Sequence, residues 1–459
     1  MESKLAQVAN ELFRKTGLDW ALRKAELEDL RGKLLSGTLG SFGVKIGTVL
    51  LSFAANLVLA RVLGASTYGI YAYALAWMNL IAVPATFGMD NVLVRDVSAY
   101  RTREQWRHLS GLLWWSNGAA LLFSLLLAGA AAIAVAMFME SPVQRTALWI
   151  ALAALPVAAL TRLRKGALRG LQHVVVGQLP EQIIRPVLLM ALLGGTYAIL
   201  RQPIAAPLAV AFYVCASGIA FAVGAWMLRA RLPNSVTKAA STFETKAWMR
   251  SALPFMLIGG MKVLNKRTDI VMMGILSTNQ EVGIYKIASR GGTLVVMLFY
   301  AFSTAVAPRI SELYASGEIE KLQRIAVKGA RTVFALTIPI AGGLVLLGDW
   351  FLLLFGREFT AGYLVLVILS FGQLSNLVAG VVGILLNMTG HERAVATGMG
   401  ISAALNIALN AALIPLMGME GAATATAISQ VIWNGLLVFW SYRQFGFAPS
   451  AFSSFVEKS

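Results

Sequence analysis

Twelve runs of about twenty mainly apolar residues constrain the possible folds more than any other feature of this chain. An α-helix needs roughly 20 apolar residues to cross the hydrocarbon core of a bilayer. The predicted spans are 37–61, 68–88, 109–138, 145–161, 180–200, 205–228, 250–276, 282–308, 332–354, 361–386, 394–415 and 421–441. Hydrophobic residues make up 58% of the chain and charged residues only 13%, proportions that exclude an ordinary soluble protein. The sequence therefore predicts an integral membrane protein.

Small residues indicate which kind of membrane fold the spans form. The chain has 42 glycines, and alanine and serine recur inside the apolar runs, as expected where membrane helices pack closely. The only cysteine, Cys215, lies in an apolar run, which excludes disulfides and cysteine-based metal sites. We therefore expect an all-α integral membrane bundle of about twelve transmembrane helices.

The distribution of lysine and arginine between the loops predicts the orientation of the spans. Most of the 39 basic residues fall on one side of the membrane, and only Arg61, Arg145, Arg201 and Arg357 fall on the other. By the positive-inside rule, both termini are predicted in the cytosol. The same bias accounts for most of the net charge of +17, so we expect no nucleic-acid partner.

Composition also divides the chain into segments. The predicted boundaries are a cytosolic amphipathic segment at 1–36, an N-lobe of spans one to six at 37–228, a cytosolic inter-lobe linker at 229–247, a C-lobe of spans seven to twelve at 248–443 and a cytosolic tail at 444–459. The linker contains the stretch "RARLPNSVTKAASTFETK", which is polar and charged and includes Pro, Ser and Thr.

Several basic residues fall inside predicted spans, where an ionised side chain costs about 2.5–3.5 kcal/mol or more. They are Lys45, Arg185, Lys262, Lys266, Arg267, Lys286 and Arg290. Extension to the interface explains Arg185 and remains open for Lys286. It does not explain Lys262, which lies about 21 Å into span seven at 1.5 Å per residue, near the middle of a ~30 Å hydrocarbon core.

The spacing of these charges predicts a polar lumen. Lys262, Lys266 and Asp269 recur at i, i+4 and i+7 and form one stripe of a helix, while Lys286 and Arg290 form an i, i+4 pair on the next span. Intramembrane charges face a water-filled cavity or the bundle interior. We therefore favour a lumen over a misassigned span.

An internal repeat relates the two halves. "LGASTYGIYAYA" at 63–74 is echoed by "LSTNQEVGIYKIA" at 276–288, and an offset of 214 aligns the two Gly-Ile-Tyr motifs. The same offset pairs Ala74, Val92, Arg95 and Tyr100 with Ala288, Val306, Arg309 and Tyr314. Six spans fit within this period, so the copies run parallel, as two six-helix lobes. Two such lobes with a polar seam are typical of an alternating-access transporter.

The chain resembles the polysaccharide or oligosaccharide-lipid flippases (Wzx type) of the MOP superfamily, which also contains the MATE exporters and the MurJ lipid II flippases. The motifs that carry this resemblance are "LARVLGASTYGIYAYA" at 59–74, "PEQIIRP" at 180–186, "VGIYKIASR" at 282–290 and "LNIALNAALIPLMGMEGAATATAIS" at 405–429. The resemblance implies the MATE-like fold, with spans one, two, seven and eight lining a central cavity. MurJ-like proteins usually add two further spans, and no apolar run remains here to supply them.

The resemblance also implies a cargo: an oligosaccharide linked to an isoprenoid of the undecaprenyl-diphosphate type. Such a flippase moves this lipid to the outer leaflet of the bacterial cytoplasmic (inner) membrane for O-antigen (lipopolysaccharide), capsule or exopolysaccharide synthesis. The diphosphate would be met by Lys45, Lys262, Lys266, Arg267, Lys286 and Arg290. Asp269 is expected to pair with Lys266 or Arg267, with proton coupling as the alternative. We interpret Glu181 and Arg185 as an intrahelical pair at the cytosolic mouth.

Three other functions remain as alternatives. A MATE-type exporter of cationic drugs would need carboxylates in its site, and a MurJ-type lipid II flippase would need the two missing spans. A membrane glycan polymerase or ligase is disfavoured because the outer loops have about six residues each and His108, His173 and His391 lie far apart. We expect no enzyme activity, cofactor or metal site. The partners expected are the bilayer, the lipid-linked substrate and polysaccharide polymerase or chain-length machinery, and the protein is expected to be monomeric.

Overall fold

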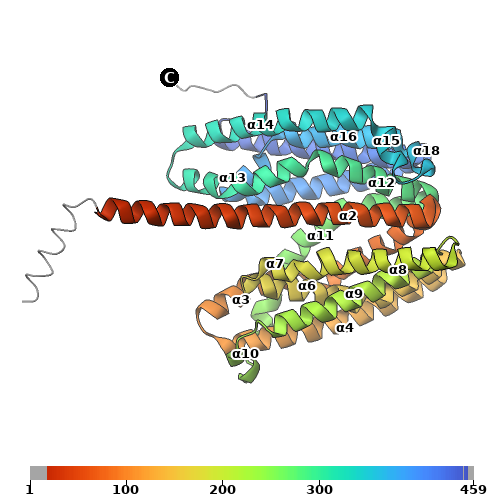
Figure 1. Cartoon of the computed structure of the whole chain (residues 1–459), viewed down its shortest axis with the longest axis horizontal. Coiled ribbons are helices and arrows are strands. Elements are labelled where there is room, and N and C mark those ends of the chain that lie inside the picture. Colours follow the sequence, from red (N-terminus) through yellow and green to blue (C-terminus); the bar gives the residue numbers. More distant parts are fainter. Residues whose placement is uncertain (1–17, 448, 453–459) are drawn as a thin grey trace, which may run out of the picture. The chain divides into compact units, whose positions relative to one another are not determined.

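The chain is helical in a computed structural model of the protein (Figure 1). The structure describes the backbone of residues 18–447 and 449–452. It describes side chains from residue 47 onward within that part, except at 238, 298, 301, 304 and 305. These residues contain α-, 3-10 and π-helix and no strand, which confirms the all-α prediction.

The chain divides into two compact units, one up to Ala54 and one from Ala55 to the end. The first unit consists, in its described part, of the beginning of α2 (Leu18–Thr86), which is helical from Leu18. The predicted segment 1–36 lies partly outside the described residues. The elements from α3 onward belong to the second unit.

The helices up to residue 229 pack mainly on one another and form an N-terminal bundle (Figure 1). They are α3 (Met89–Thr102), α4 (Trp106–Phe138), α5 (Pro142–Ala153), α6 (Leu155–Gly170), α7 (Val174–Leu179), the π-helical turn η1 (Pro180–Ile184), α8 (Arg185–Leu200) and α9 (Ala206–Arg229). The short α10 (Asn234–Lys238) lies in the predicted linker and contacts α4.

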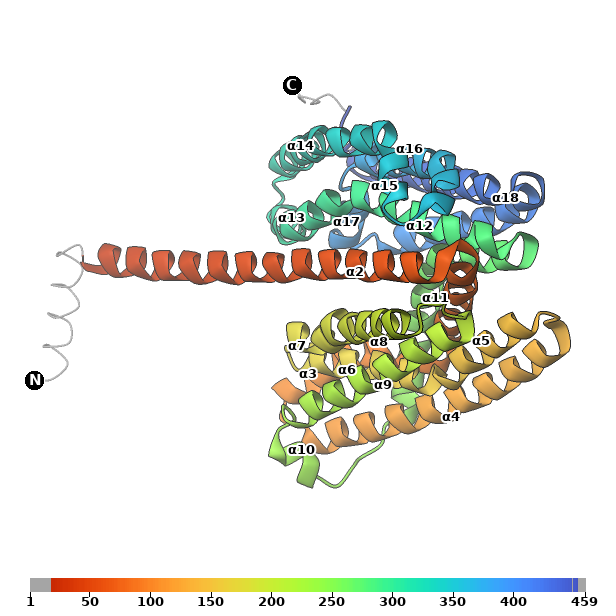
Figure 2. The same cartoon turned by 45° about the vertical axis from the view of Figure 1, so that its right-hand side comes forward.

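A second group of helices forms the C-terminal bundle (Figure 2). It contains α11 (Thr245–Leu276), α12 (Asn279–Val295), α13 (Met297–Ala315), α14 (Ile319–Leu346), α15 (Gly348–Leu353), the 3-10 turn η2 (Arg357–Gly362), α16 (Tyr363–Ala379), α17 (Val382–Met388) and α18 (Glu392–Phe445). The helix α11 contacts both groups. Trp248 and Ala252 near its start are buried in the core of the N-terminal bundle, whereas α11 also packs on α12 and α18.

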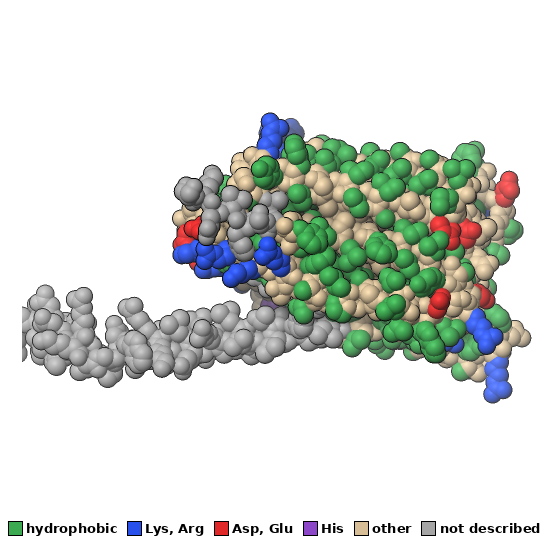
Figure 3. All heavy atoms as spheres, turned by 90° about the horizontal axis from the view of Figure 1, so that it is seen from above, with side chains coloured by type: hydrophobic (Ala, Val, Ile, Leu, Met, Phe, Trp, Pro, Cys, Tyr) green, Lys and Arg blue, Asp and Glu red, His purple; other side chains and the backbone are tan. Residues whose placement is uncertain are grey.

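Eight helices in the described part are long and apolar enough to cross a membrane. Two of them, Gly47–Thr86 and Glu392–Phe445, contain a break at a glycine and each correspond to two predicted spans. Predicted spans seven and eight are also helical, as α11 and as α12 with α13, which carry the intramembrane charges. On the face drawn in Figure 3, hydrophobic side chains cover the middle and charged side chains lie toward the ends. The protein is therefore a multi-pass membrane protein.

The turn between spans one and two lies within the predicted loop at 62–67. Two helical segments of α2 meet there across a break at Gly64, whose φ of 69° is left-handed and favours glycine. The following Ala65 N–H donates to Glu358 Oε2 at 2.8 Å. A carboxylate at the start of a helix satisfies an N–H and interacts favourably with the helix dipole, by about 0.3–1 kcal/mol.

The turn between spans eleven and twelve uses the same arrangement. Two helical segments of α18 meet within the predicted loop at 416–420, across a break at Gly418, which has a φ of 55°. Met419 N–H then donates to Glu281 Oε2 at 3.2 Å. Span eight differs from its prediction. The expected single helix is divided at Val296 into α12 and α13.

The glycines of the two repeated Gly-Ile-Tyr motifs contact each other. A Cβ atom on Gly69 would lie 1.7 Å from the backbone oxygen of Asn279, and one on Gly283 would lie 2.0 Å from the backbone oxygen of Ala65. Each hypothetical Cβ also lies close to the other glycine's nitrogen, at 3.0 and 3.1 Å. This reciprocal contact is the arrangement expected when a pseudo-two-fold axis relates two repeats.

We predict that Gly69→Ala and Gly283→Ala each destabilise the protein by about 1–3 kcal/mol, because the added methyl group forces two backbones apart. The thermal unfolding midpoint of the purified protein in detergent measures this effect. Gly118→Ala is the matched control, since nothing lies within 4 Å of a Cβ at that helical glycine. Equal midpoints for all three variants would contradict the close contact.

Candidate functional site

A polar cavity of about 200 Å³ lies within the C-terminal bundle. Its walls come from α11, α12, α16 and α18. The lining residues are Lys266, Arg267, Asp269, Ile270, Tyr285, Lys286, Ser289, Arg290, Thr293, Leu369, Gln373 and Thr426. Five of the residues predicted from sequence to form a site therefore share one cavity, four cations and one carboxylate.

The cations of this cavity have no ion-pair partner in the described part of the chain. No carboxylate oxygen there lies within 4.0 Å of a nitrogen of Lys266, Arg267, Lys286 or Arg290. The Nε atom of Arg290 is buried and makes no hydrogen bond among these residues. Unpaired cations within a membrane span are costly. The arrangement suits an anion that supplies the missing acceptors.

The partners of the Asp269 carboxylate differ from the predicted ones. The expected pairing with Lys266 or Arg267 is not found; its carboxylate instead accepts hydrogen bonds from neutral groups. The Tyr285 and Thr426 hydroxyls donate to Oδ2 at 2.7 and 2.8 Å. The Asn410 amide donates to Oδ1 at 2.9 Å. The spacing rule that led to the pairing places Asp269 one turn from Lys266, but its buried side chain faces α12 and α18.

Two polar residues of α18 extend this network. Asn406 Oδ1 accepts from the Asn410 amide at 3.0 Å, and both asparagines are buried. The sequence placed Asn406 and Asn410 in a family motif but did not indicate a partner on α11. Buried amides with i, i+4 spacing are the signal for such a partner, because a buried polar group needs hydrogen bonds.

Two further predicted residues do not line the cavity in the described part. Lys262 lies four residues before Lys266 on α11, and its side chain is exposed. Lys45 falls within α2, but its side chain is outside the described residues. The polar stripe predicted on span seven therefore reaches the cavity with Lys266 and Asp269 but not with Lys262.

The predicted pair of Glu181 with Arg185 is wrong. Glu181 forms a buried ion pair with Arg164 of α6, and Arg185 donates to the Tyr213 hydroxyl at 3.1 Å. Residues 180–184 form a π-helical turn, in which the Arg185 N–H bonds to the oxygen of Pro180, five residues earlier. The wider turn moves residues four apart off a common face, so the i, i+4 rule does not apply there.

A basic cluster in the N-terminal bundle was missed by sequence reasoning. The stretch "TRLRKGALRG" at 161–170 was assigned to a cytosolic loop, but it forms the end of α6, and Arg164 is only 3% exposed. The glycines of this stretch allow close packing. A Cβ on Gly166 would lie 2.4 Å from the backbone oxygen of Asp90. Glycines four residues apart in a basic stretch were the available signal for a packed helix.

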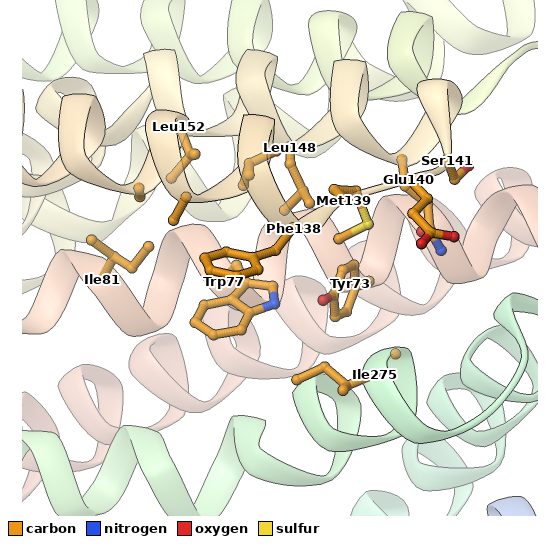
Figure 4. Close-up of a pocket in the computed structure, with 15 residues that line it drawn as sticks. Tyr73, Trp77, Ile81, Phe138, Met139, Glu140, Ser141, Leu148, Leu152 and Ile275 are labelled. Atoms are coloured by element: carbon orange, nitrogen blue, oxygen red, sulfur yellow. The ribbon is translucent and has the colours of Figure 1, made fainter.

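An apolar groove of about 670 Å³ lies between α2, α4, α5 and the end of α11. Tyr73, Trp77, Phe138 and Leu148 face one another across it, and Glu140 lies at one end (Figure 4). The groove contains no cluster of titratable side chains. In the described part of the chain, no group of three or more His, Cys, Asp or Glu residues is placed to hold a metal ion.

Comparisons with known proteins agree with this architecture. The probable low-salt glycan biosynthesis flippase Agl15 of Haloferax volcanii is 24% identical over 387 residues, which cover 83% of this chain and 77% of that protein. Among solved structures, the lipid II flippase MurJ in an inward closed conformation superposes with a TM-score of 0.70 at 17% identity, covering 86% of each chain.

A multidrug resistance MATE family transporter of the MOP superfamily, in an inward-facing conformation, gives a TM-score of 0.68 at 13% identity. That superposition covers 87% of this chain and 94% of the other. These likenesses confirm the predicted MATE-like fold.

Two family descriptions match the sequence. The MatE family matches residues 254–412, a part that includes most of α11 and reaches into α18. The family of polysaccharide biosynthesis proteins matches residues 34–314, more than half of the chain, including the Gly-Ile-Tyr repeats and both cation-bearing helices. The chain, with its MOP-type helical fold and cationic cavity, therefore belongs to the polysaccharide biosynthesis protein family.

Proposed function

We propose that this protein is a flippase that moves a lipid-linked glycan across the membrane. The observation that carries the proposal is the cavity with one carboxylate already bonded to neutral donors and four cations that have no ion-pair partner among the described residues. The relative from Haloferax volcanii, named as a probable glycan biosynthesis flippase, supports the same class of cargo.

The chemistry of such a cargo fits this cavity. Each sugar hydroxyl taken from water into hydrocarbon without a partner costs about 2–7 kcal/mol, so a glycan cannot cross a bilayer unaided. A polar lumen removes this barrier. A phosphate-linked lipid also carries anionic oxygens, which accept charge-assisted hydrogen bonds from lysine and arginine. We assign Lys266, Arg267, Lys286 and Arg290 to this role, with Lys262 and Lys45 as further candidates.

More specifically, we propose an undecaprenyl-diphosphate type of carrier and movement from the cytosolic to the outer leaflet of a bacterial cytoplasmic membrane. The product would serve O-antigen, capsule or exopolysaccharide synthesis, with polymerase or chain-length machinery as partners. The neighbouring genes test this choice, because glycosyltransferases and a polymerase should accompany such a flippase.

The second candidate function is a MATE-type exporter of organic cations, which the match of residues 254–412 to the MatE family favours. The charge of the cavity opposes it. A cationic drug would meet four like charges and a carboxylate whose oxygens are already occupied. Like charges in a low-dielectric site repel strongly, so this function requires a different binding region.

We predict that Arg267→Gln and Arg290→Gln abolish surface glycan while lipid-linked glycan accumulates in the cytosolic leaflet, because the phosphate loses charged donors. Glycan staining of cells and extraction of the lipid-linked intermediate measure both effects. Lys328→Gln, an exposed position on α14, is the control. Normal surface glycan in well-expressed cavity variants would remove these residues from the site.

We predict that a reporter fused at residue 240 or 320 reports a cytosolic location, and one fused at 141 or 357 an external location. The reason is the excess of lysine and arginine in the loops assigned to the cytosol. At each position, one fusion to a phosphatase and one to a fluorescent protein measure on which side of the membrane the reporter lies. The reverse pattern would overturn the proposed direction of transport.

The driving force follows from the charge of the cargo. A diphosphate carries about two negative charges, and an inside-negative potential favours their outward movement, which releases about 2.3 kcal/mol per charge per 100 mV. We propose that this potential drives transport, with Asp269 holding α11, α12 and α18 in place through its three hydrogen bonds.

We predict that transport in proteoliposomes follows the sign of a potassium-diffusion potential and survives Asp269→Asn. The asparagine keeps an acceptor for Tyr285 and Thr426, and Asn410 can turn its unpartnered buried Oδ1 toward the new amide. Asp269→Ala removes the acceptor, so we expect it to reduce the thermal unfolding midpoint. Transport that needs a proton gradient and an ionisable Asp269 would instead establish ion coupling.

A further inference from the structure

A groove of about 330 Å³ lies in the N-terminal bundle and shares no lining residue with the cationic cavity. Its sides come from the membrane-spanning helices α4 and α9, which run side by side and both pack on α6 (Figure 1, Figure 2). Most of the lining is apolar, with Leu113 on α4 and Phe221, Ala225 and Leu228 on α9. A groove of this kind between two spans suits a hydrocarbon chain.

One end of the groove carries a positive charge. Arg229 is the last residue of α9; it lines the groove, and its side chain is exposed. No carboxylate oxygen in the described part of the chain lies within 4.0 Å of its guanidinium nitrogens. An apolar groove with a cation at one end has the polarity of an amphiphile with an anionic head.

The other guanidinium of the groove is already occupied. Arg164 of α6 also lines it but is only 3% exposed. One of its terminal nitrogens forms the ion pair with Glu181, and the other donates to the backbone oxygen of Ala220 at 3.3 Å. Arg229 is therefore the lining residue that can bind an anionic group from outside the protein.

A second basic residue lies at the same end of the bundle. Arg107 is in the first turn of α4, its side chain is exposed, and no carboxylate among the described residues lies within ion-pair distance of it. The backbone N–H of Thr242, in the segment that follows α9, donates to the Arg107 backbone oxygen at 3.1 Å. The start of α4 and the end of α9 thus lie at one end, which the positive-inside rule assigns to the cytosol.

Two exposed tryptophans lie beside the groove. Trp114 of α4 follows Leu113 and is 73% exposed, and Trp226 of α9 is 68% exposed. Tryptophan is enriched where the hydrocarbon of a membrane meets its headgroups. Arg229 lies three residues beyond Trp226, or about 4.5 Å farther along the helix axis. A lipid whose chain occupies the groove would therefore present its headgroup to Arg229.

We propose that this groove binds one anionic phospholipid of the surrounding bilayer, with an acyl chain between α4 and α9 and the phosphate at Arg229. The bilayer lipid is favoured over the cargo because the groove and the cationic cavity share no residue. A net negative headgroup is favoured over a zwitterionic one because two unpaired arginines lie at this end, and basic residues at the cytosolic surface attract anionic lipids. The inference does not depend on the proposed function.

The first test counts phosphatidylglycerol molecules retained by the purified full chain in native mass spectrometry. We expect one tightly held lipid, and we expect Arg229→Gln to weaken its binding about tenfold, as for loss of a hydrogen bond to a charged group. Arg443→Gln is the matched control, because Arg443 is also exposed in the last turn of a long helix but lines none of the cavities described. Normal binding by Arg229→Gln would overturn the site.

The second test separates the groove from attraction to a charged surface. Ala225→Phe fills the groove and leaves Arg229 in place, so we expect a similar loss of binding. Ala222→Phe, at an exposed position of α9 that does not line the groove, should bind as the wild type does. If Ala225→Phe binds normally while Arg229→Gln does not, the lipid is held by surface charge alone and the groove is wrong.

A photoreactive phosphatidylglycerol, with the reactive group in its acyl chain, gives the same answer for the wild type and does not depend on a variant that folds. The label should map to α4 and α9, and equal labelling of the exposed faces of α14 and α16 would contradict the site. Two competitors identify the ligand. Phosphatidylcholine that competes as well as phosphatidylglycerol would overturn the anionic headgroup, and displacement by a lower concentration of farnesyl diphosphate would assign the groove to a prenyl chain instead.

Discussion

The need to surround intramembrane charge with polar groups governs the arrangement of this protein. Lys266, Arg267, Lys286 and Arg290 lie within the predicted membrane spans seven and eight, and an isolated cation in hydrocarbon is strongly disfavoured. The fold meets this requirement by gathering the four side chains around one cavity between α11, α12, α16 and α18. The remaining imbalance of charge is the reason to infer an anionic cargo.

The single carboxylate of the cavity is kept apart from these cations. Asp269 is bonded to Tyr285, Thr426 and Asn410, which join α11 to α12 and α18. Hydrogen bonds to a charged acceptor contribute about 1.5–3 kcal/mol each. This network joins three helices of the cavity wall without neutralising the lysines and arginines that line the same cavity. Gly69 and Gly283 have no side chain, which lets the backbones of the two repeats contact each other.

Periodicity and composition were enough to predict the helical membrane fold and several of its spans, and five of the residues singled out by sequence line one cavity. The spans follow from apolar runs, and the lumen follows from Lys266 and Asp269 repeating on one face. Details that depend on local backbone geometry were not predictable. The expected single helix of span eight, for example, is divided at Val296 into α12 and α13.

The sequence also did not predict which side chains contact each other. The π-turn at 180–184 moved Glu181 away from Arg185 and toward Arg164, seventeen positions earlier in the chain. The basic stretch of α6 could not be separated from a cytosolic loop, because lysine and arginine mark both. Contacts between residues distant in sequence, such as Asp269 with Asn410, depend on the packing of whole helices.

Photo-cross-linking from α16 tests the central claim most directly. Gln373 lines the cavity, whereas Phe371, two residues away on the same helix, is 61% exposed on the outer surface. A photoreactive amino acid at position 373 should capture the lipid-linked glycan in cells that make it, giving an adduct detectable by mass and by glycan staining, and position 371 should not. Equal labelling at both positions, or no glycan adduct at 373 in a well-expressed protein, would contradict the account.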